Sequence, residues 1–265
     1  MPETVFTDVR RFETIDSTNR YLLDEARTGA PEGVVAVADH QTAGRGRLGR
    51  SWEAPAGANL LISVLLRPPL GHGQRHLATT AVALAAMDAI STTGASGGGA
   101  SGRVGIKLPN DLVAPDGRKL AGVLAEADLT SVTPGSRAPV VVGIGINVNW
   151  PAVDEDLPPE LRGVATSLRQ LAGVPVDREA LLAALLAALG PRVASFATEA
   201  GKAQLAGDLR SACTTLGTPV RVDLPDGSFT GTAVSVTDDG HLVVGTDGGP
   251  RTVVAGDVVH VRPDG

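Results

Sequence analysis

The strongest constraint on the fold is a change of sequence pattern near residue 214. Before this point, long apolar runs alternate with segments rich in alanine and leucine. Beyond it the chain breaks into short segments of alternating polarity, TPVRVDL, SFTGTAVSVT, HLVVGT and RTVVAGDVVHVR, separated by the turn signals PDG, DDG and DGG. Alternation with a period of two between such turns predicts antiparallel strands. The pattern therefore predicts a large unit over residues 1–213 and a small all-β unit over residues 214–265.

Apolar runs rich in β-branched residues predict the strands of the larger unit. Residues 34–41 and 58–68 form two such runs on either side of a glycine-rich loop. Residues 119–129, which follow a DG turn, and residues 139–150 form two more. Together these four runs predict a central sheet.

Helices are predicted around this sheet. The first predicted helix starts after Asp16, Ser17 and Thr18 and stops at Gly29. An apolar helix is predicted over residues 77–90 and a shorter one over residues 202–213. Between them, a helix over residues 177–199 is predicted to be interrupted near Gly190 and Pro191. We expect the later helices to pack on one face of the sheet. The Gly/Ser linker at 91–103 has few apolar side chains and is expected to be mobile. The fold class is α+β, followed by a small β-barrel of the SH3-like kind.

Charge and cysteine content exclude several functions. The formal net charge of −6 disfavours broad nucleic-acid binding, because phosphates favour clustered positive charge. The one cysteine, Cys213, excludes an internal disulfide and a multi-cysteine metal site, and we expect a buried, inert thiol. The N-terminus shows no signal-peptide core and the apolar stretches fall short of the ~20 residues of a membrane span. We therefore expect a cytoplasmic protein with no membrane partner.

The loop GRGRLGR, residues 44–50, places three glycines among three arginines. Glycine lets backbone amides approach an anion closely, and guanidinium groups match phosphate geometry. The loop lacks the GK[ST] ending of a P-loop, and Trp52 and another strand follow it in place of a helix. Composition alone leaves two interpretations open, a phosphate-binding loop and an ordinary basic surface turn.

Two further segments contain candidate site residues. In KLPND, residues 107–111, the proline restrains the backbone beside Lys107, so that this lysine can project from a fixed position. In GIGIN, residues 143–147, two glycines leave room for a flat ligand against a strand. A solvated lysine and a tight bend are the structural alternatives.

In this order the segments DSTN, HQTAGRGRLGR, ANLLISV, KLPND, KLAGVLAE and GIGINVN resemble the catalytic domain of biotin-protein ligases over nearly its whole length. The resemblance implies a mixed β-sheet flanked by helices and followed by an SH3-like domain. It also implies an ATP-dependent ligase that forms biotinyl-5'-AMP and transfers biotin to a lysine of biotin carboxyl carrier domains of carboxylases. Lipoate-protein ligase, with a related fold and the same adenylation logic, is the alternative.

The resemblance also implies roles for single residues. It implies a biotin site made of Ser17, Thr18, Asn19, Gln41, Gly44, Arg45, Gly46, Arg47, Lys107, Gly122, Gly143 and Gly145, and a nucleotide site made of Arg47, Arg50, Trp52, Asn110 and Asn147. Within these sets Lys107, Arg45 and Arg47 correspond to the catalytic residues. For Trp52, packing in the core is the alternative interpretation.

The implied reaction brings two anions together, because the biotin carboxylate attacks the α-phosphorus of ATP. Arg45, Arg47, Lys107 and Mg²⁺ would offset the repulsion. Magnesium commonly binds through substrate phosphates with few protein ligands, so the sequence identifies no metal ligand. The expected partners are biotin, ATP and the carrier domain, and the expected assembly is a monomer or weak homodimer.

The sequence departs from the family pattern at Leu108, where the family usually has tryptophan. A large flat surface is therefore missing beside Lys107. A rival class is a non-catalytic binding protein or transcription regulator. Sixteen residues precede Ser17, too few for the N-terminal winged helix of DNA-binding family members, so we expect no DNA partner.

Overall fold

The computed structural model describes residues 6–95, 103–128, 137–224, 226–254 and 257–260. The larger unit contains the strands β1 (Val9–Ile15), β2 (Val35–Gln41), β3 (Leu60–Leu66), β4 (Gly105–Lys107), β5 (Asp111–Val113), β6 (Lys119–Ala127) and β7 (Val140–Ile146). They form one sheet with the order β1-β2-β3-β7-β6-β5-β4. The β1 and β2 strands are parallel and the other neighbours are antiparallel. The mixed sheet is therefore confirmed.

The four strands predicted from apolar runs are β2, β3, β6 and β7, and they form the centre of the sheet. Three outer strands were not predicted. β1 lies at one edge and most of its side chains are partly or fully exposed, so its sequence, VRRFETI, lacks an apolar run. β4 and β5 have three residues each, too few for a periodic pattern.

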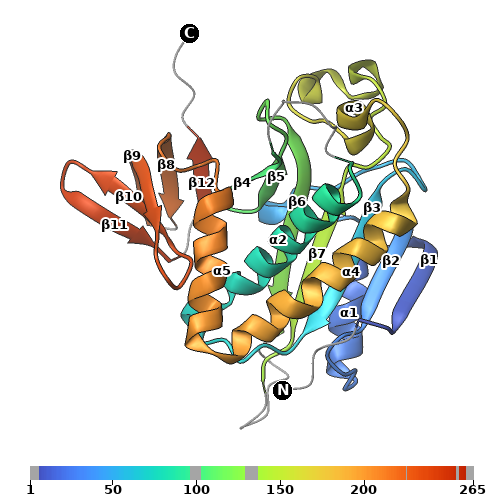
Figure 1. Ribbon diagram of the computed structural model, residues 1–265, viewed down its shortest axis with the longest axis horizontal. Helices are drawn as coiled ribbons and strands as arrows, with labels where there is room; N and C mark the ends of the chain where they lie inside the picture. Colours follow the sequence, from blue (N-terminus) through green and yellow to red (C-terminus); the bar gives the residue numbers. More distant parts are fainter. Residues whose placement is uncertain (1–5, 96–102, 129–136, 225, 255–256, 261–265) are drawn as a thin grey trace.

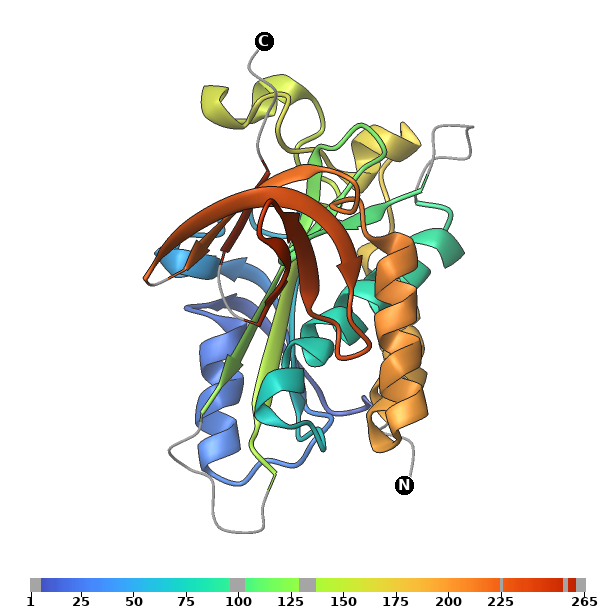
Figure 2. The same ribbon diagram turned by 90° about the vertical axis from the view of Figure 1, so that its left-hand side faces the viewer.

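Helices cover both faces of this sheet (Figures 1 and 2). On one face lie α2 (His76–Thr92) and α4 (Arg178–Ala194), with α5 (Glu199–Ala212) packed beside α2; on the other lies α1 (Thr18–Arg27), and α3 (Leu168–Ala172) follows β7 at one end. The expectation that the later helices lie on one face holds, because α4 and α5 both pack along α2, whereas α1 covers the opposite face. Leu22 of α1 is fully buried against Leu65 and Val141 on the opposite face.

The predicted interruption at Gly190 and Pro191 is wrong. α4 runs through both residues, and the chain turns only at the 3-10 segment Ser195–Ala197. Proline in a helix interior removes one hydrogen bond at a cost of about 3 kcal/mol, but buried apolar side chains on either side of it, Leu189 and Val193, hold the helix in the core. α5 then begins at Glu199, three residues before its predicted start.

The segment Arg178–Ala197 is long and apolar enough to cross a membrane by length and composition alone. Its apolar side chains have another explanation. Leu181, Leu185 and Leu189 are completely buried in the core of the larger unit, where α4 packs along α2. The composition of this helix is thus that of a core helix.

The C-terminal unit is a five-stranded antiparallel sheet. Its strands are β8 (Pro219–Leu224), β9 (Gly227–Val236), β10 (Leu242–Thr246), β11 (Gly249–Val253) and β12 (Asp257–His260), in the order β11-β10-β9-β8-β12. Val220, Val222 and Val244 are fully buried in a core of its own. The predicted small all-β domain is confirmed. Of the predicted linker at 91–103, residues 96–102 lie outside the described residues.

Leu108 lies where the two units meet. It packs against the cores of both, and its amide donates a hydrogen bond to Thr215 Oγ1 at 2.9 Å. Nearby, the rings of His76 and His241 lie 4.3 Å apart, and Gln74 Nε2 donates to Asp239 Oδ1 at 2.7 Å. The leucine that replaces the family's tryptophan thus contributes to the junction of the two units.

Candidate active site

A cavity of about 130 Å³ lies on the α1 side of the sheet, beneath the GRGRLGR loop. It brings together residues that are far apart in the sequence. The lining consists of Ser17, Thr18, Asn19, Gln41, Arg45, Gly46, Arg47, Arg50, Ser51, Trp52, Ile62, Ser63, Asn110, Asp111, Lys119, Gly122, Val123, Leu124, Gly143, Ile144 and Gly145. Most of the predicted site residues are therefore neighbours in space. We call this space the ligand cavity.

One end of the ligand cavity is uncharged and closely hydrogen-bonded. The backbone amide and Oγ1 of Thr18 donate to Gln41 Oε1 at 2.8 and 3.1 Å. Thr18 Oγ1 also lies 2.7 Å from the hydroxyl of Ser63, which donates to Asn19 Oδ1 at 2.6 Å. Ser17 is the N-cap of α1 and is buried. We call these residues the neutral end.

The sequence prediction did not include Ser63, although it lies in ANLLISV, a segment that carried the resemblance. In the structure it is completely buried between the side chains of Thr18 and Asn19. A polar residue in an otherwise apolar central strand was the available signal, because buried hydroxyls need partners.

Glu126 connects the neutral end with the arginine loop. Asn19 Nδ2 donates to Glu126 Oε2 at 2.8 Å, and Arg45 Nη1 forms an ion pair with Glu126 Oε1 at 3.0 Å. Glu126 was likewise absent from the prediction, although KLAGVLAE was among the motifs. The Arg45 side chain is 41% exposed, so this pair contributes little stability. Its consequence is geometric, because it orients Arg45 over the cavity.

The arginine loop forms a small closed turn. Gly46 N donates to Arg50 O at 2.6 Å, and Trp52 N donates to Gly44 O at 3.0 Å. A Cβ on Gly44 would collide with the carbonyl oxygen of Trp52, so the close approach of the two segments requires glycine there. The expectation that backbone amides of this loop cradle an anion is therefore wrong for Gly46, whose amide is used within the loop. Anion binding would then fall to the guanidinium groups.

The indole of Trp52 lies directly on the glycines of the central strands. A Cβ on Gly145 would lie 2.6 Å from Trp52 Cε2, and one on Gly122 would lie 3.1 Å from Trp52 Cζ3. Of the space predicted for a flat ligand at the two glycines of GIGIN, the part at Gly145 is thus occupied by the protein's own flat side chain. At Gly143 the neighbour is Asn19, whose Oδ1 would collide with a Cβ.

The lysine that lines the ligand cavity is Lys119. Its Nζ forms an ion pair with Asp111 Oδ1 at 2.7 Å and lies 5.5 Å from the centre of the Trp52 ring. The same atom would lie 3.3 Å from a Cβ on Gly122, in the middle of the sheet. Four of the lining residues are cationic, Arg45, Arg47, Arg50 and Lys119, against one carboxylate, Asp111. We call this part the cationic end.

Lys107 is not part of the lining. It lies on the outermost strand, β4, where its ladder partner is Asp111, and Asp111 is paired in turn with Gly122 on β6. Lys107 is therefore two strands farther out than Gly122, whereas Lys119 lies on the same strand as Gly122. The sequence analysis selected Lys107, in KLPND, and did not select Lys119, in KLAGVLAE.

Two predicted nucleotide contacts have structural partners in the protein. Asn147 is buried, donates from Nδ2 to Thr166 O at 3.0 Å and accepts from Asn59 at 3.2 Å; it does not line the ligand cavity. Asn110 does line it, but its Nδ2 donates to Val123 O at 2.8 Å. Both side chains hold the wall of the site.

A larger cavity of about 550 Å³ lies between α2, β6 and the C-terminal sheet. Its lining is mostly apolar, with His76 and His241 at the junction. Burial and the facing His241 lower the pKa of His76 to about 4, so His76 is neutral at pH 7. Burial raises the pKa of the Cys213 thiol, in agreement with the expected inert cysteine. The smaller cavity has the denser set of charged and hydrogen-bonding groups.

Among the described residues there is no group of three His, Cys, Asp or Glu side chains placed to hold a metal ion. Asp111 is the carboxylate that the ligand cavity offers. One carboxylate at a cationic site fits a magnesium ion that is held mainly by phosphate oxygens.

The fold is that of a known class of ligases. Residues 11–147 match the Biotin/lipoate A/B protein ligase family, and residues 215–261 match the Biotin protein ligase C terminal domain. The chain belongs to the biotin/lipoate A/B protein ligase family.

Several relatives are biotin ligases by name. The biotin–[acetyl-CoA-carboxylase] ligase of Mycobacterium tuberculosis is 40% identical, covering 93% of this chain and 86% of its own length. The bifunctional ligase/repressor BirA of Escherichia coli is 34% identical, covering 92% and 71%. The solved structure of the Aquifex aeolicus biotin protein ligase in complex with biotin and ATP has a TM-score of 0.77 at 27% identity, covering 97% of this chain and all of that one.

Proposed function

We propose that this chain condenses biotin with ATP to biotinyl-5'-AMP and then transfers biotin to a lysine of a biotin carboxyl carrier domain. One observation carries the proposal: a single cavity joins a neutral hydrogen-bonding end to a cationic end. The relatives named as biotin ligases and the similar structure with biotin and ATP support it.

The neutral end suits the ureido ring of biotin. That ring is uncharged and has two N–H donors and one carbonyl acceptor. Ser17, Thr18, Gln41 and Ser63 carry hydroxyl and amide groups that both donate and accept hydrogen bonds. A site built to hydrogen-bond such a group discriminates strongly against a ligand that lacks it. Lipoate carries a dithiolane in place of the ureido ring, so biotin is the favoured substrate.

The cationic end suits the reacting groups. When the biotin carboxylate attacks the α-phosphorus of ATP, pyrophosphate leaves and negative charge accumulates between two anions. Preorganised cations at this point stabilise the transition state more than the ground state. Arg45 and Arg47 extend from the loop, and Lys119 extends from β6 below it.

We assign the central catalytic role to Lys119 in place of Lys107. Lys119 lies in the lining, is only 35% exposed and has its ammonium over Gly122. In this structure Asp111 and the Trp52 ring hold that ammonium inside the cavity. Lys119 would thereby keep the biotin carboxylate and the phosphoryl oxygens together.

Magnesium would supply charge neutralisation on the phosphate oxygens of ATP. Asp111 is the residue placed to contribute a protein oxygen to it. In the second half-reaction the amine of the acceptor lysine attacks the carbonyl of the mixed anhydride, and AMP leaves. Arg45 and Trp52, which lie over the cavity, would exclude water until then.

Ligand binding requires the roof of the cavity to move. The cavity volume of about 130 Å³ is below the ~300 Å³ at which pockets for drug-sized ligands begin. The Trp52 indole occupies the space above Gly145. We further propose that the protein acts in the cytoplasm as a monomer or weak homodimer, without DNA.

The experiment that tests the function is transfer of radiolabelled biotin to a purified biotin carboxyl carrier domain. Incorporation should require ATP and Mg²⁺, and lipoate in place of biotin should give little product on a lipoyl carrier domain. Arg162→Ala, on the surface away from the cavity, is the matched control and should retain activity. Labelling without ATP, or equal use of lipoate, would contradict the proposal.

A further inference from the structure

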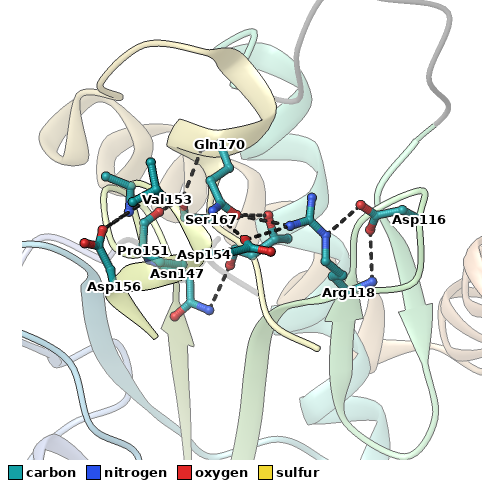
Figure 3. A network of polar contacts seen from close by, with 11 residues as sticks. Asp116, Arg118, Asn147, Pro151, Val153, Asp154, Asp156, Ser167 and Gln170 are labelled. Carbon is teal, nitrogen blue, oxygen red and sulfur yellow. Dashed lines mark hydrogen bonds and ion pairs between the residues drawn. The ribbon is translucent and has the colours of Figure 1, made fainter. Parts of the chain in front are cut away.

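A closed ring of polar side chains joins the turn before β6 to the segment that follows β7 (Figure 3). Arg118 Nη1 donates to Asp154 Oδ1 and to Gln170 Oε1, each at 3.3 Å. Gln170 Nε2 donates to Asp154 Oδ1 at 3.0 Å, and Thr166 Oγ1 donates to Gln170 Oε1 at 2.7 Å. Arg118 Nε also donates to Asp116 Oδ2 at 2.7 Å. The Arg118 side chain is 25% exposed and that of Asp154 is 42% exposed, so the ring lies at the surface with its guanidinium partly buried.

The backbone of Lys119, next to Arg118 in the chain, is bonded to the same segment as the ring. The amide of Lys119 donates to Val164 O at 2.7 Å, and its carbonyl accepts from the amide of Thr166 at 2.9 Å. Both backbone groups of Lys119 are therefore bonded to the segment that Gln170 and Arg118 tie down. A lysine placed at the first residue of a strand has few ladder bonds of its own, so its position depends on this outside clamp.

We propose that Arg118 and Gln170 are positioning residues of the adenylation site, which act by fixing the backbone from which Lys119 extends. This inference rests on the proposed function and deepens it. Neither residue lines the ligand cavity, so they act through Lys119. The clamp lies at the cationic end, so its loss changes the handling of ATP more than the binding of biotin, whose ureido ring is held at the neutral end by Ser63 and Gln41.

The segment has other anchors, so removal of the ring leaves the fold intact. Leu157 and Leu168 are buried in the same segment, and Asn147 ties its middle to Asn59. Arg162 stabilises the segment internally, donating to the carbonyl of Leu157 at 3.0 Å without reaching β6. It is thus the control that separates stability of the segment from its attachment to Lys119.

The test uses the full chain in three variants, Arg118→Ala, Gln170→Leu and Arg162→Ala. Pyrophosphate exchange with ATP and biotin measures the two KM values and kcat. Arg118→Ala and Gln170→Leu should raise KM for ATP about tenfold, with KM for biotin within about twofold, as expected for lost hydrogen bonds to a charged group. Arg162→Ala should shift neither KM. Arg118→Lys should recover only part of the loss, because one compact ammonium cannot reach acceptors that are spread around a planar guanidinium.

Hydrogen exchange gives a readout that does not depend on activity. In Arg118→Ala the amides of Lys119 and Thr166 should exchange at least about tenfold faster, while those of β3 and β7 keep their protection. Equal rises in both KM values, an unchanged KM for ATP, or unchanged exchange at Lys119 would overturn the inference. If the unaltered protein shows no biotin-dependent pyrophosphate exchange, the proposed function fails, whatever the amide exchange rates show.

Discussion

The two ends of the ligand cavity are built differently. At the neutral end, the side chains of Thr18, Gln41 and Ser63 start from a helix and two central strands and bond to one another. At the cationic end the arginines come from a loop whose backbone bonds are internal. Leu48 at the tip of this loop is 69% exposed and has a φ of +57°, a conformation that leucine rarely adopts.

The difference indicates that the two ends play different parts in binding. The neutral end is preformed, because each polar group already has a partner on a rigid element. The cationic end depends on a loop attached to the sheet by Trp52 and the exposed pair of Arg45 with Glu126. The contacts for the ureido ring of biotin should therefore be preformed, whereas the contacts for ATP should form only when ATP binds. Loss of a group at one end should then affect the two substrates unequally.

The largest effect is expected at the cationic end. Lys119→Ala should lower the rate of pyrophosphate release by about a hundredfold, since removal of one preorganised donor costs roughly 3 kcal/mol of transition-state stabilisation. Lys107→Ala should change the rate less than twofold, because Lys107 is outside the lining. Lys119→Arg should rescue only partly, as a planar fork cannot place its charge where an ammonium lies. The opposite order of the two alanine variants would restore Lys107 as the catalytic lysine.

Acid should weaken the scaffold that both ends share. The pKa of His76 is lowered from 6.5 to about 4 by burial and by His241. Between these values the unfolded chain binds a proton that the folded protein does not, so stability is full above pH 6.5 and is lost as the pH falls toward 4. The loss attributable to His76 is roughly 2 to 3 kcal/mol. Urea unfolding of the unaltered protein and of His76→Gln at pH 7 and pH 4.5 measures it, and identical pH dependences would contradict the assignment.

A smaller effect is expected at the neutral end. Ser63→Ala removes the bond to Asn19 Oδ1 and the contact with Thr18 Oγ1. We expect KM for biotin to rise about tenfold, because a buried acceptor loses its donor at a cost of about 1 to 3 kcal/mol. KM for ATP should stay within twofold, as measured by pyrophosphate exchange over both substrates. Equal changes in the two constants would mean that the ends are not separate.

The smallest effect concerns the loop itself. Biotin together with ATP should slow amide exchange over residues 44–51 several-fold, and biotin alone should do less. Arg47→Gly should speed the release of biotinyl-AMP more than it slows its synthesis. Trapping of released biotinyl-AMP with hydroxylamine measures its release from the Arg47→Gly variant. For the loop, slow amide exchange over residues 44–51 in the absence of any ligand would contradict the proposed difference between the two ends.

Some site residues could be predicted from the sequence because short motifs keep them together. Thr18 and Asn19 sit at a helix start beside Ser17, and Arg45 and Arg47 sit in one loop, so the segments that carry the family resemblance already contain them. Ser63 and Glu126 also lie in such segments, ANLLISV and KLAGVLAE, but were not selected. Their common partner, Asn19 of α1, accepts from Ser63 and donates to Glu126, and only this packing of α1 on the sheet makes them part of the site.

Local pattern in the chain is enough to specify the central strands, the all-β C-terminal unit and the segments that surround the cavity, because periodicity and turn residues are local properties. Which lysine enters the cavity depends on the folded arrangement. Sheet order puts Lys107 on the outermost strand and Lys119 beside Gly122. Register also places the Trp52 indole over bare backbone at Gly145, where the glycine pattern had suggested a ligand. Strand order and register follow from long-range pairing, which no segment specifies alone.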